Sequence, residues 1–346
     1  MVRKILKFMS EDPLELARIA NKSFIQLLTD GFRLFGKNWI KIIIPISLFY
    51  VISLFIRIVL LVNANWDLIL LEAIVNPLAN VDPSTLTESQ LNVMLTYIYS
   101  TWGIDTLNFI IGNLFTTLGL CSVSMYLYKD YLGEKTSLTE SMKGAFNRKM
   151  IAVLLILALA IPLGNFMLVI PAIVIFGFYI FSIYTYQLDN NEMSIKEAKI
   201  LSKRAFWKII GTFLVSGLIT LTLTTFNQML IEIMFPVSYS TLVSFYDPAN
   251  LRFDLIFVYN LMNNIAFILF EPLFICLLTP LFIHMKARKK LGYGYQRENS
   301  YQRVYNPPSQ PEYVEDGLYC PFCGQHLDFK LKFCPSCGES IDFLTK

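Results

Sequence analysis

Residues 40–62 read IKIIIPISLFYVISLFIRIVLLV, and this stretch decides the class of fold. It carries only two charged side chains, Lys41 at its start and Arg57 near its end. A helix rises 1.5 Å per residue, so such a helix is about 34 Å long and can cross the roughly 30 Å of hydrocarbon in a bilayer. The stretch therefore predicts a transmembrane helix.

Five further segments have the same apolar character: Leu107–Tyr128, Met150–Leu163, Phe166–Tyr186, Ile209–Phe235 and Phe253–Met285. The segment Met150–Leu163 is short, and we expect it either to recruit Ala145 and Phe146 or to end before the far interface. The last segment is long enough to be tilted or kinked. With 55% hydrophobic and 16% charged residues, the chain exceeds the apolar content of soluble domains. The sequence predicts an all-α polytopic membrane protein built as a six-helix bundle.

The basic residues predict the orientation of these spans. Of the 29 Lys and Arg residues, 27 lie in four stretches that six spans place on one side: residues 1–41, 129–149, 189–208 and 286–346. The exceptions are Arg252 and Arg57, and we expect Arg57 to extend its guanidinium toward the outer interface. Basic loops stay in the cytoplasm, so we expect a multi-pass cell-membrane protein with both termini cytoplasmic.

A capping box, in which a Ser or Thr is followed three residues later by Glu or Gln, occurs before three of the spans. The boxes begin at Ser23, Ser137 and Ser194, and each opens a basic amphipathic stretch that ends in aromatic and basic residues. Such stretches suit the headgroup layer of a membrane. We interpret them as three repeated units, each an interfacial amphipathic helix followed by a helical hairpin, with chance as the alternative.

Residues 137–219 resemble a known membrane family. The matching features are Pro162-Leu-Gly, Val169-Ile-Pro171, Ser194-Ile-Lys-Glu-Ala198 and the run from Ser202 to Trp207. The segment is similar to the membrane domain found beside some bacterial glycerophosphodiester phosphodiesterases and to the related YciC-like proteins. The resemblance implies six helices with bent members over about residues 40–280. In those phosphodiesterases a separate barrel carries catalysis, and this chain has no such segment, so we expect no enzyme.

The C-terminal residues predict one structural zinc ion. Two knuckles, Cys320-Pro-Phe-Cys323-Gly and Cys334-Pro-Ser-Cys337-Gly, each place two thiolates at the spacing of a zinc ribbon. Four protein ligands close the tetrahedron and leave no position for a catalytic water. Disulfides or free thiols are the alternatives, and a reducing cytoplasm argues against disulfides. His326 lies between the knuckles, but four cysteines already suffice.

These features divide the chain into four parts. They are a cytoplasmic amphipathic N-terminal region (1–39), a six-span membrane domain (40–286), a flexible linker rich in Tyr, Gln, Asn and Pro (287–317), and the zinc ribbon (318–346). The ribbon carries three Lys against three acidic residues, so it offers no basic patch for nucleic acid. A cytoplasmic protein is the partner that such a module suits, beside the lipid bilayer itself.

Glu271 lies in the middle of the sixth predicted span, directly before Pro272. A charged group at that depth costs roughly 2.5–3.5 kcal/mol on insertion scales, which makes it a candidate functional residue. Alternatively, it is protonated or paired and only joins two helices, for example at the backbone carbonyl that Pro272 frees. Asn260, Asn263 and Asn264 precede it and form either a polar seam with it or simple packing contacts.

Two functions fit these patterns. The leading hypothesis is a non-enzymatic integral membrane protein whose ribbon is a cytoplasmic interaction or stability module. The alternative is a transporter or channel for a small solute or lipid, and a lipid enzyme would need converging polar groups at one depth. A polar cavity that reaches Glu271 would favour the transporter or channel, whereas a closed apolar bundle would favour the interaction module.

Overall fold

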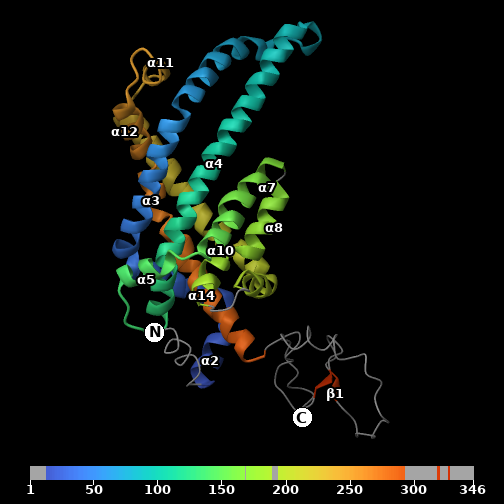
Figure 1. Cartoon of the computed structure of the whole chain (residues 1–346), viewed down its shortest axis with the longest axis vertical. Coiled ribbons are helices and arrows are strands. Elements are labelled where there is room, and N and C mark those ends of the chain that lie inside the picture. The colour runs from blue at the N-terminus through green and yellow to red at the C-terminus, as the bar shows by residue number, and fades with distance from the viewer. Residues whose placement is uncertain (1–12, 168, 189–193, 293–317, 320–325, 328–346) are drawn as a thin grey trace. The chain divides into compact units, whose positions relative to one another are not determined.

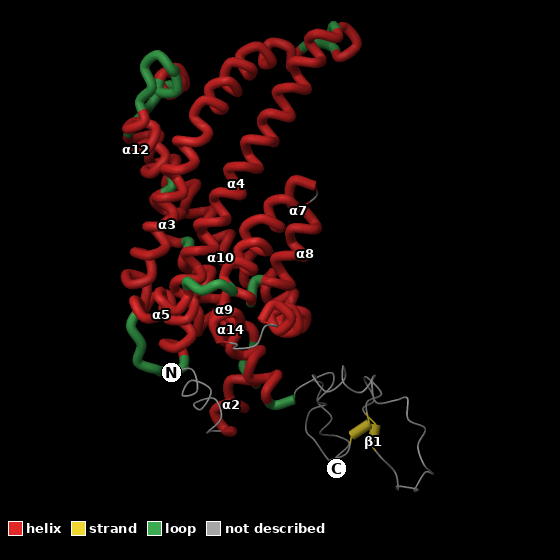
Figure 2. Tube along the Cα trace, viewed as in Figure 1, coloured by secondary structure: helices red, strands yellow, loops and turns green. Residues whose placement is uncertain are grey.

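A computed structural model shows the fold and describes residues 13–167, 169–188, 194–292, 318–319 and 326–327 (Figure 1). Nearly all of these residues are helical (Figure 2). Five helices are long and apolar enough to cross a membrane, or six if one pair bent by 81° counts as a single span. The prediction of an all-α fold with several helices of membrane-spanning length is therefore confirmed for the described residues.

Helices α3 (Phe24–Val75) and α4 (Glu88–Tyr131) are far longer than the spans expected there. With 52 and 44 residues they measure about 78 and 66 Å, more than twice the hydrocarbon thickness. They run antiparallel in contact, and a Cβ on Gly119 would lie 3.6 Å from the Cα of Ile46. Both extend beyond α7 and α8 (Figure 1), so the hairpin continues past the membrane core.

The short third span does not recruit Ala145 and Phe146. Helix α5 (Leu138–Ala145) ends there, and the chain turns by 81° before the next helical run. Asn147 stabilises the turn, because its side chain donates to the Gly144 carbonyl and accepts from the backbone N–H of Lys149. The run after the turn comprises α6 (Met150–Leu154), a π-helical segment (Leu155–Ala160) and α7 (Ile161–Met167).

The remaining helices follow in chain order. They are α8 (Val169–Tyr179), α9 (Ser182–Leu188), α10 (Ser194–Met234), α11 (Tyr239–Ser244), α12 (Phe253–Asn263), α13 (Ile265–Phe270) and α14 (Pro272–Lys290). The sixth predicted span is thus broken at Asn264 and Glu271. Pro272 lacks the N–H that would bond back to Ile268, which explains the second break.

The capping boxes differ from the expectation of three interfacial helices. At Ser23 both reciprocal hydrogen bonds with Gln26 form, and at Ser137 the hydroxyl accepts from the Glu140 N–H. The side chain of Ser194 lies outside the described residues. At Ser23 and Ser194 the helix continues directly into α3 and α10, so of the three stretches only α5 is a separate helix. A fourth box, Thr87 with Gln90, starts α4 and was missed.

The chain divides into two compact units. In the larger unit, residues 23–282, the core includes Phe282, whose ring stacks on Tyr184 with centroids 4.5 Å apart and contacts Tyr128 and Phe181. The second unit contains α2 (Pro13–Ala20) and the end of α14. There Leu16 and Ala20 pack on Ala287.

Gly31 provides a test of the packing of α3 against α14. A Cβ at Gly31 would lie 2.7 Å from the Cα of Leu277, whereas Gly36 on the same helix faces open space. We expect Gly31→Ala to destabilise the bundle by about 1–3 kcal/mol through overpacking. Gly36→Ala should be neutral or stabilising by up to about 1 kcal/mol, because alanine favours helix. Thermal unfolding of the purified protein measures both, and equal midpoints would contradict the packing.

Candidate functional site

A polar cavity of about 380 Å³ lies between α3, α4 and the junction of α12 with α13. The three elements contribute eleven lining residues: Tyr50, Ser53 and Arg57 from α3; Asp105, Asn108, Phe109, Gly112, Asn113 and Thr116 from α4; and Asn264 and Phe267 from the junction. Most of these side chains can form hydrogen bonds. The cavity is therefore a polar site within helices of membrane-spanning length.

Helix α4 supplies the polar stripe of this cavity. Asp105, Asn108, Gly112, Asn113 and Thr116 follow the spacing i, i+3, i+7, i+8 and i+11, so one face of the helix carries them all. The sequence analysis missed this stripe, because it treated residues 107–128 only as an apolar run. The period of the polar residues within that run is the signal that would have revealed it.

Contacts between α3 and α4 set the depth of the cavity. At one end Lys37 Nζ pairs with Asp130 at 2.8 Å, and Gly119 lies beside Ile46 further along. Thr116 is 14 residues from Asp130, about 21 Å along the helix. Asp105 lies about 16 Å beyond Thr116 in the same direction, so the cavity lies well away from the Lys37–Asp130 pair along the hairpin.

Glu271 is 9% exposed and lies next to Thr116, which lines the cavity, but is not itself a lining residue. Its Oε1 accepts a hydrogen bond from Thr116 Oγ1 at 2.8 Å, while Oε2 is buried without a partner. Glu271 therefore joins α4 and does not bond the backbone freed by Pro272. Nearby, Trp39 Nε1 donates to the Leu269 carbonyl at 2.9 Å. The helix break at Glu271 thus leaves one buried carboxylate oxygen without a hydrogen bond, beside a residue that lines the cavity.

Unpartnered buried polar atoms cluster around this cavity. Ser53 Oγ, Arg57 Nε and Asn113 Nδ2 belong to lining residues, and Glu271 Oε2 lies beside Thr116. A buried polar group without a hydrogen bond costs about 1–3 kcal/mol each. Four such atoms from three helices at one place indicate a site built for another molecule, rather than a packing error.

Arg57 does not extend toward the outer interface as expected. Its guanidinium carbon lies 5.7 Å from the centroid of the Tyr50 ring, two turns back along α3 and deeper in the span. This distance allows a cation–π interaction. The arginine therefore faces the cavity.

The predicted asparagines lie in different places. Asn264 lines the cavity, and its side chain donates to the Asn260 carbonyl. Asn260 donates to the Ile256 carbonyl within its own helix, and the Asn263 carbonyl accepts from Asn227 on α10. The structure thus brings Glu271 and Asn264 to one site, whereas Asn260 and Asn263 do not line it.

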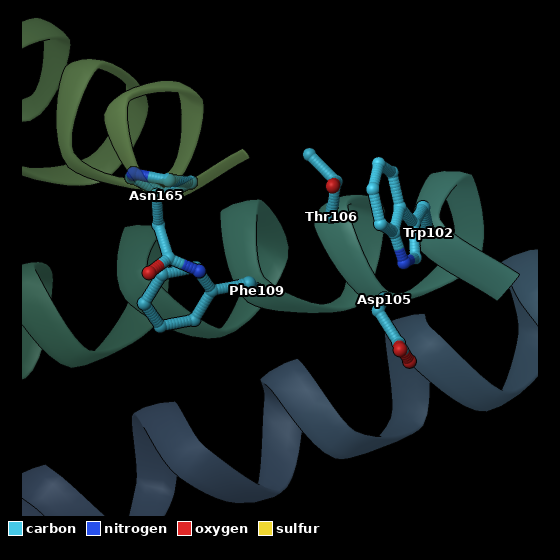
Figure 3. A pocket seen from close by; sticks show the side chains of 6 residues that line it. Trp102, Asp105, Thr106, Phe109 and Asn165 are labelled. Carbon is cyan, nitrogen blue, oxygen red and sulfur yellow. The ribbon is translucent and has the colours of Figure 1, made fainter. Parts of the chain in front are cut away.

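A second cavity of about 390 Å³ lies between α4 and α7. Trp102, Asp105, Thr106 and Phe109 line it from α4, and Pro162 and Asn165 from α7. Figure 3 shows Asn165 facing Phe109, with Asp105 pointing toward α3. Asp105 and Phe109 line both cavities, so α4 separates two polar spaces at the same depth.

The predicted zinc ligands Cys320, Cys323, Cys334 and Cys337 lie outside the described residues. Within the part that the structure describes, no group of three or more His, Cys, Asp or Glu side chains could hold a metal ion. Strands β1 (Leu318–Tyr319) and β2 (His326–Leu327) are described and pair antiparallel, with Leu318 opposite Leu327. This pairing closes the loop that carries the first knuckle.

Comparisons of the chain with protein-family models, with curated proteins and with solved structures give no match. The resemblance to the phosphodiesterase-associated and YciC-like membrane domains therefore stays a prediction.

Thr116→Val tests the interhelical bond at Glu271. Valine keeps the shape but leaves Oε1 of a buried carboxyl without its donor, so we expect a loss of about 1–3 kcal/mol in stability. Thr222→Val is the matched control, because the Thr222 hydroxyl is exposed and bonds only within α10. Thermal unfolding provides the measurement. If Thr116→Val is equally destabilising in a Glu271→Leu background, the bond does not contribute.

Proposed function

We propose that this chain is a non-enzymatic integral membrane protein that transports a small polar solute or a lipid headgroup through the cavity beside Glu271. The single observation that supports the proposal is the group of four unpartnered buried polar atoms around this cavity. A bundle that served only to anchor the ribbon would gain nothing from them, and each destabilises it. The cavity therefore favours a transporter or channel over a plain anchor.

The distribution of basic residues predicts how the chain is oriented in the membrane. With 27 of the 29 basic residues on the side of the Lys37–Asp130 pair, that side is cytoplasmic. Both termini then lie in the cytoplasm. Arg57 and Asp105 lie at the opposite end of the cavity, which accordingly opens toward the outer face.

Breaks in the helices around the site support movement of a solute. The chain is interrupted at Asn264 and Glu271, and a π-helical segment lies in the run that leads to α7. Discontinuous helices at mid-membrane depth are typical of binding sites in secondary transporters. Interruptions of this kind also supply hinges for opening and closing.

Cysteine accessibility tests the proposed pathway. We expect Ser53→Cys and Asn113→Cys variants in intact cells to react with a membrane-impermeant thiol reagent at least about tenfold faster than a Phe55→Cys control, because thiolates form only in water. Phe55 is 59% exposed on the surface of α3 outside the cavity. Cys121 and Cys276 are fully buried and give no background.

Labelling from the other side separates transport from static binding. A transporter or channel should also expose the Thr116→Cys variant to the reagent in inside-out vesicles. The four C-terminal cysteines, Cys320, Cys323, Cys334 and Cys337, are replaced by serine in this experiment, because the proposed orientation places them on the labelled side. Labelling from the outer side alone would overturn transport, and protection of every cavity position from both sides would overturn the pathway itself.

We further propose that the C-terminal residues form a zinc ribbon that serves as a cytoplasmic interaction module. The β1–β2 pairing supports this, because it brings together the two ends of the loop that carries Cys320 and Cys323. Two thiolates per knuckle match the soft, tetrahedral preference of Zn²⁺. When bound, the ion would supply structure and no chemistry, and the tail would fold only around it.

Metal analysis of the purified full chain tests the ribbon. We expect one zinc per chain, lost when Cys320→Ser and Cys334→Ser are combined, since two of four ligands disappear. His326→Ala and Cys276→Ser should retain the metal, because neither residue is a proposed ligand. Elemental analysis with a thiol count measures both states, and four cysteines found in disulfides would refute the site.

A further inference from the structure

We propose that the cavity recognises a zwitterion, with Arg57 binding its anionic group and Glu271 binding its ammonium group. This inference rests on the proposed function and names the chemical class of the ligand. The class includes free ammonium carboxylates and the headgroups of zwitterionic lipids, which share one positive and one negative group a few bonds apart.

Arg57 lies within electrostatic range of Glu271 but has no directly paired counter-ion among the described residues. It forms no ion pair there, although the carboxylate of Asp105 lines the same cavity. Its Nε is buried without a hydrogen bond, and its guanidinium lies over the Tyr50 ring. A guanidinium offers five donors in a planar fork, which suits the two oxygens of a carboxylate or phosphodiester.

Glu271, which is bonded to the cavity-lining Thr116, provides the charge opposite to that of Arg57. Thr116 already donates to Oε1, so the remaining oxygen, Oε2, is an acceptor with no donor near it. An ammonium group is the cation whose charge and hydrogen bonds would satisfy a buried carboxylate. Residues 58–128, which include most of α4, contain no Lys or Arg that could pair with Glu271 instead.

The two charges belong to one site and yet do not pair with each other. The Tyr50 phenol interacts electrostatically with both Arg57 and Glu271, and these two groups also interact with each other without forming a direct ion pair. Neutral side chains, those of Ser53, Asn108, Asn113 and Asn264, line the cavity beside them. A ligand with a single charge would pair directly with only one of the two groups, whereas a zwitterion pairs with both.

The size of the cavity agrees with a small ligand. Its volume of about 380 Å³ lies near the lower end of the roughly 300–1,000 Å³ typical of small-molecule sites. Such a space holds a headgroup or a small solute and excludes a folded partner.

Binding of free glycine, a zwitterion with a primary ammonium group, to the full chain in detergent tests this inference. Methylammonium and acetate, which carry its two charges separately, are the comparison probes. We expect free glycine to bind at least about tenfold more tightly than either. Arg57→Gln should reduce the affinity for free glycine and acetate but not for methylammonium, and Glu271→Gln should reduce the affinity for free glycine and methylammonium but not for acetate. Isothermal titration calorimetry measures each affinity.

Matched controls separate charge recognition from general damage. Arg252 pairs with Asp254 at 2.9 Å in an exposed loop, and Glu232 is exposed on α10, so Arg252→Gln and Glu232→Gln should bind like the wild type. If the Arg57 and Glu271 variants lose affinity for all three probes equally, the two residues have a structural role and the inference is overturned.

A lipid arm identifies the source of the zwitterion. In nanodiscs that mix phosphatidylethanolamine with phosphatidylglycerol, retention of the zwitterionic lipid by wild type but not by Arg57→Gln would support a headgroup ligand, while binding of free glycine supports a free solute. No preference for a zwitterion in either arm overturns the inference. If the cavity cysteines still react from outside, the proposed transport pathway survives that failure.

Discussion

The absence of water from the hydrocarbon core is the constraint on which this structure depends. Every backbone N–H and C=O group in the core must bond within its own helix, which explains why nearly all the described residues are helical. Side chains follow the same rule. The Thr116–Glu271 bond satisfies one oxygen of a carboxyl group that lipid could not solvate, and it thereby ties the broken sixth segment to α4.

Helix α4 carries most of the polar contacts that follow from this constraint. Near its C-terminal end Asp130 binds Lys37 and Asn38, and further in Gln187 donates to Ser124 and to the Cys121 carbonyl. These groups are satisfied and hold the bundle together. Toward the opposite end the polar stripe faces the cavity, where satisfaction is incomplete. One end of α4 therefore holds the bundle together, and the other end lines the cavity.

The buried polar atoms that lack hydrogen bonds around the cavity lower the stability of the fold, so a need for stability does not explain them. Natural proteins break the rule of polar satisfaction mainly where function requires it, and compensate elsewhere. Here the compensation is visible in the core of the larger unit, where aromatic rings pack on Phe282 and Gly31 allows α3 to approach α14 closely. One end whose polar groups are hydrogen-bonded and another that is polar and interrupted suit a protein that admits a ligand from one side.

The sequence by itself determined the helical class and the approximate places of the apolar segments, and it selected Glu271 as a candidate residue, because these depend on local composition and on period. It also selected Asn264, which lines the cavity, together with Asn260 and Asn263, which do not. Only the tertiary structure decided that Thr116 bonds to Glu271 and that Asn113, Ser53 and Arg57 line the cavity beside it. They lie on α3 and α4, between about 155 and 218 positions away in the chain, and no local pattern encodes which face of one helix packs against another. The lengths of α3 and α4 and the turn at Asn147 likewise depend on contacts and on side-chain hydrogen bonds that hydropathy does not register.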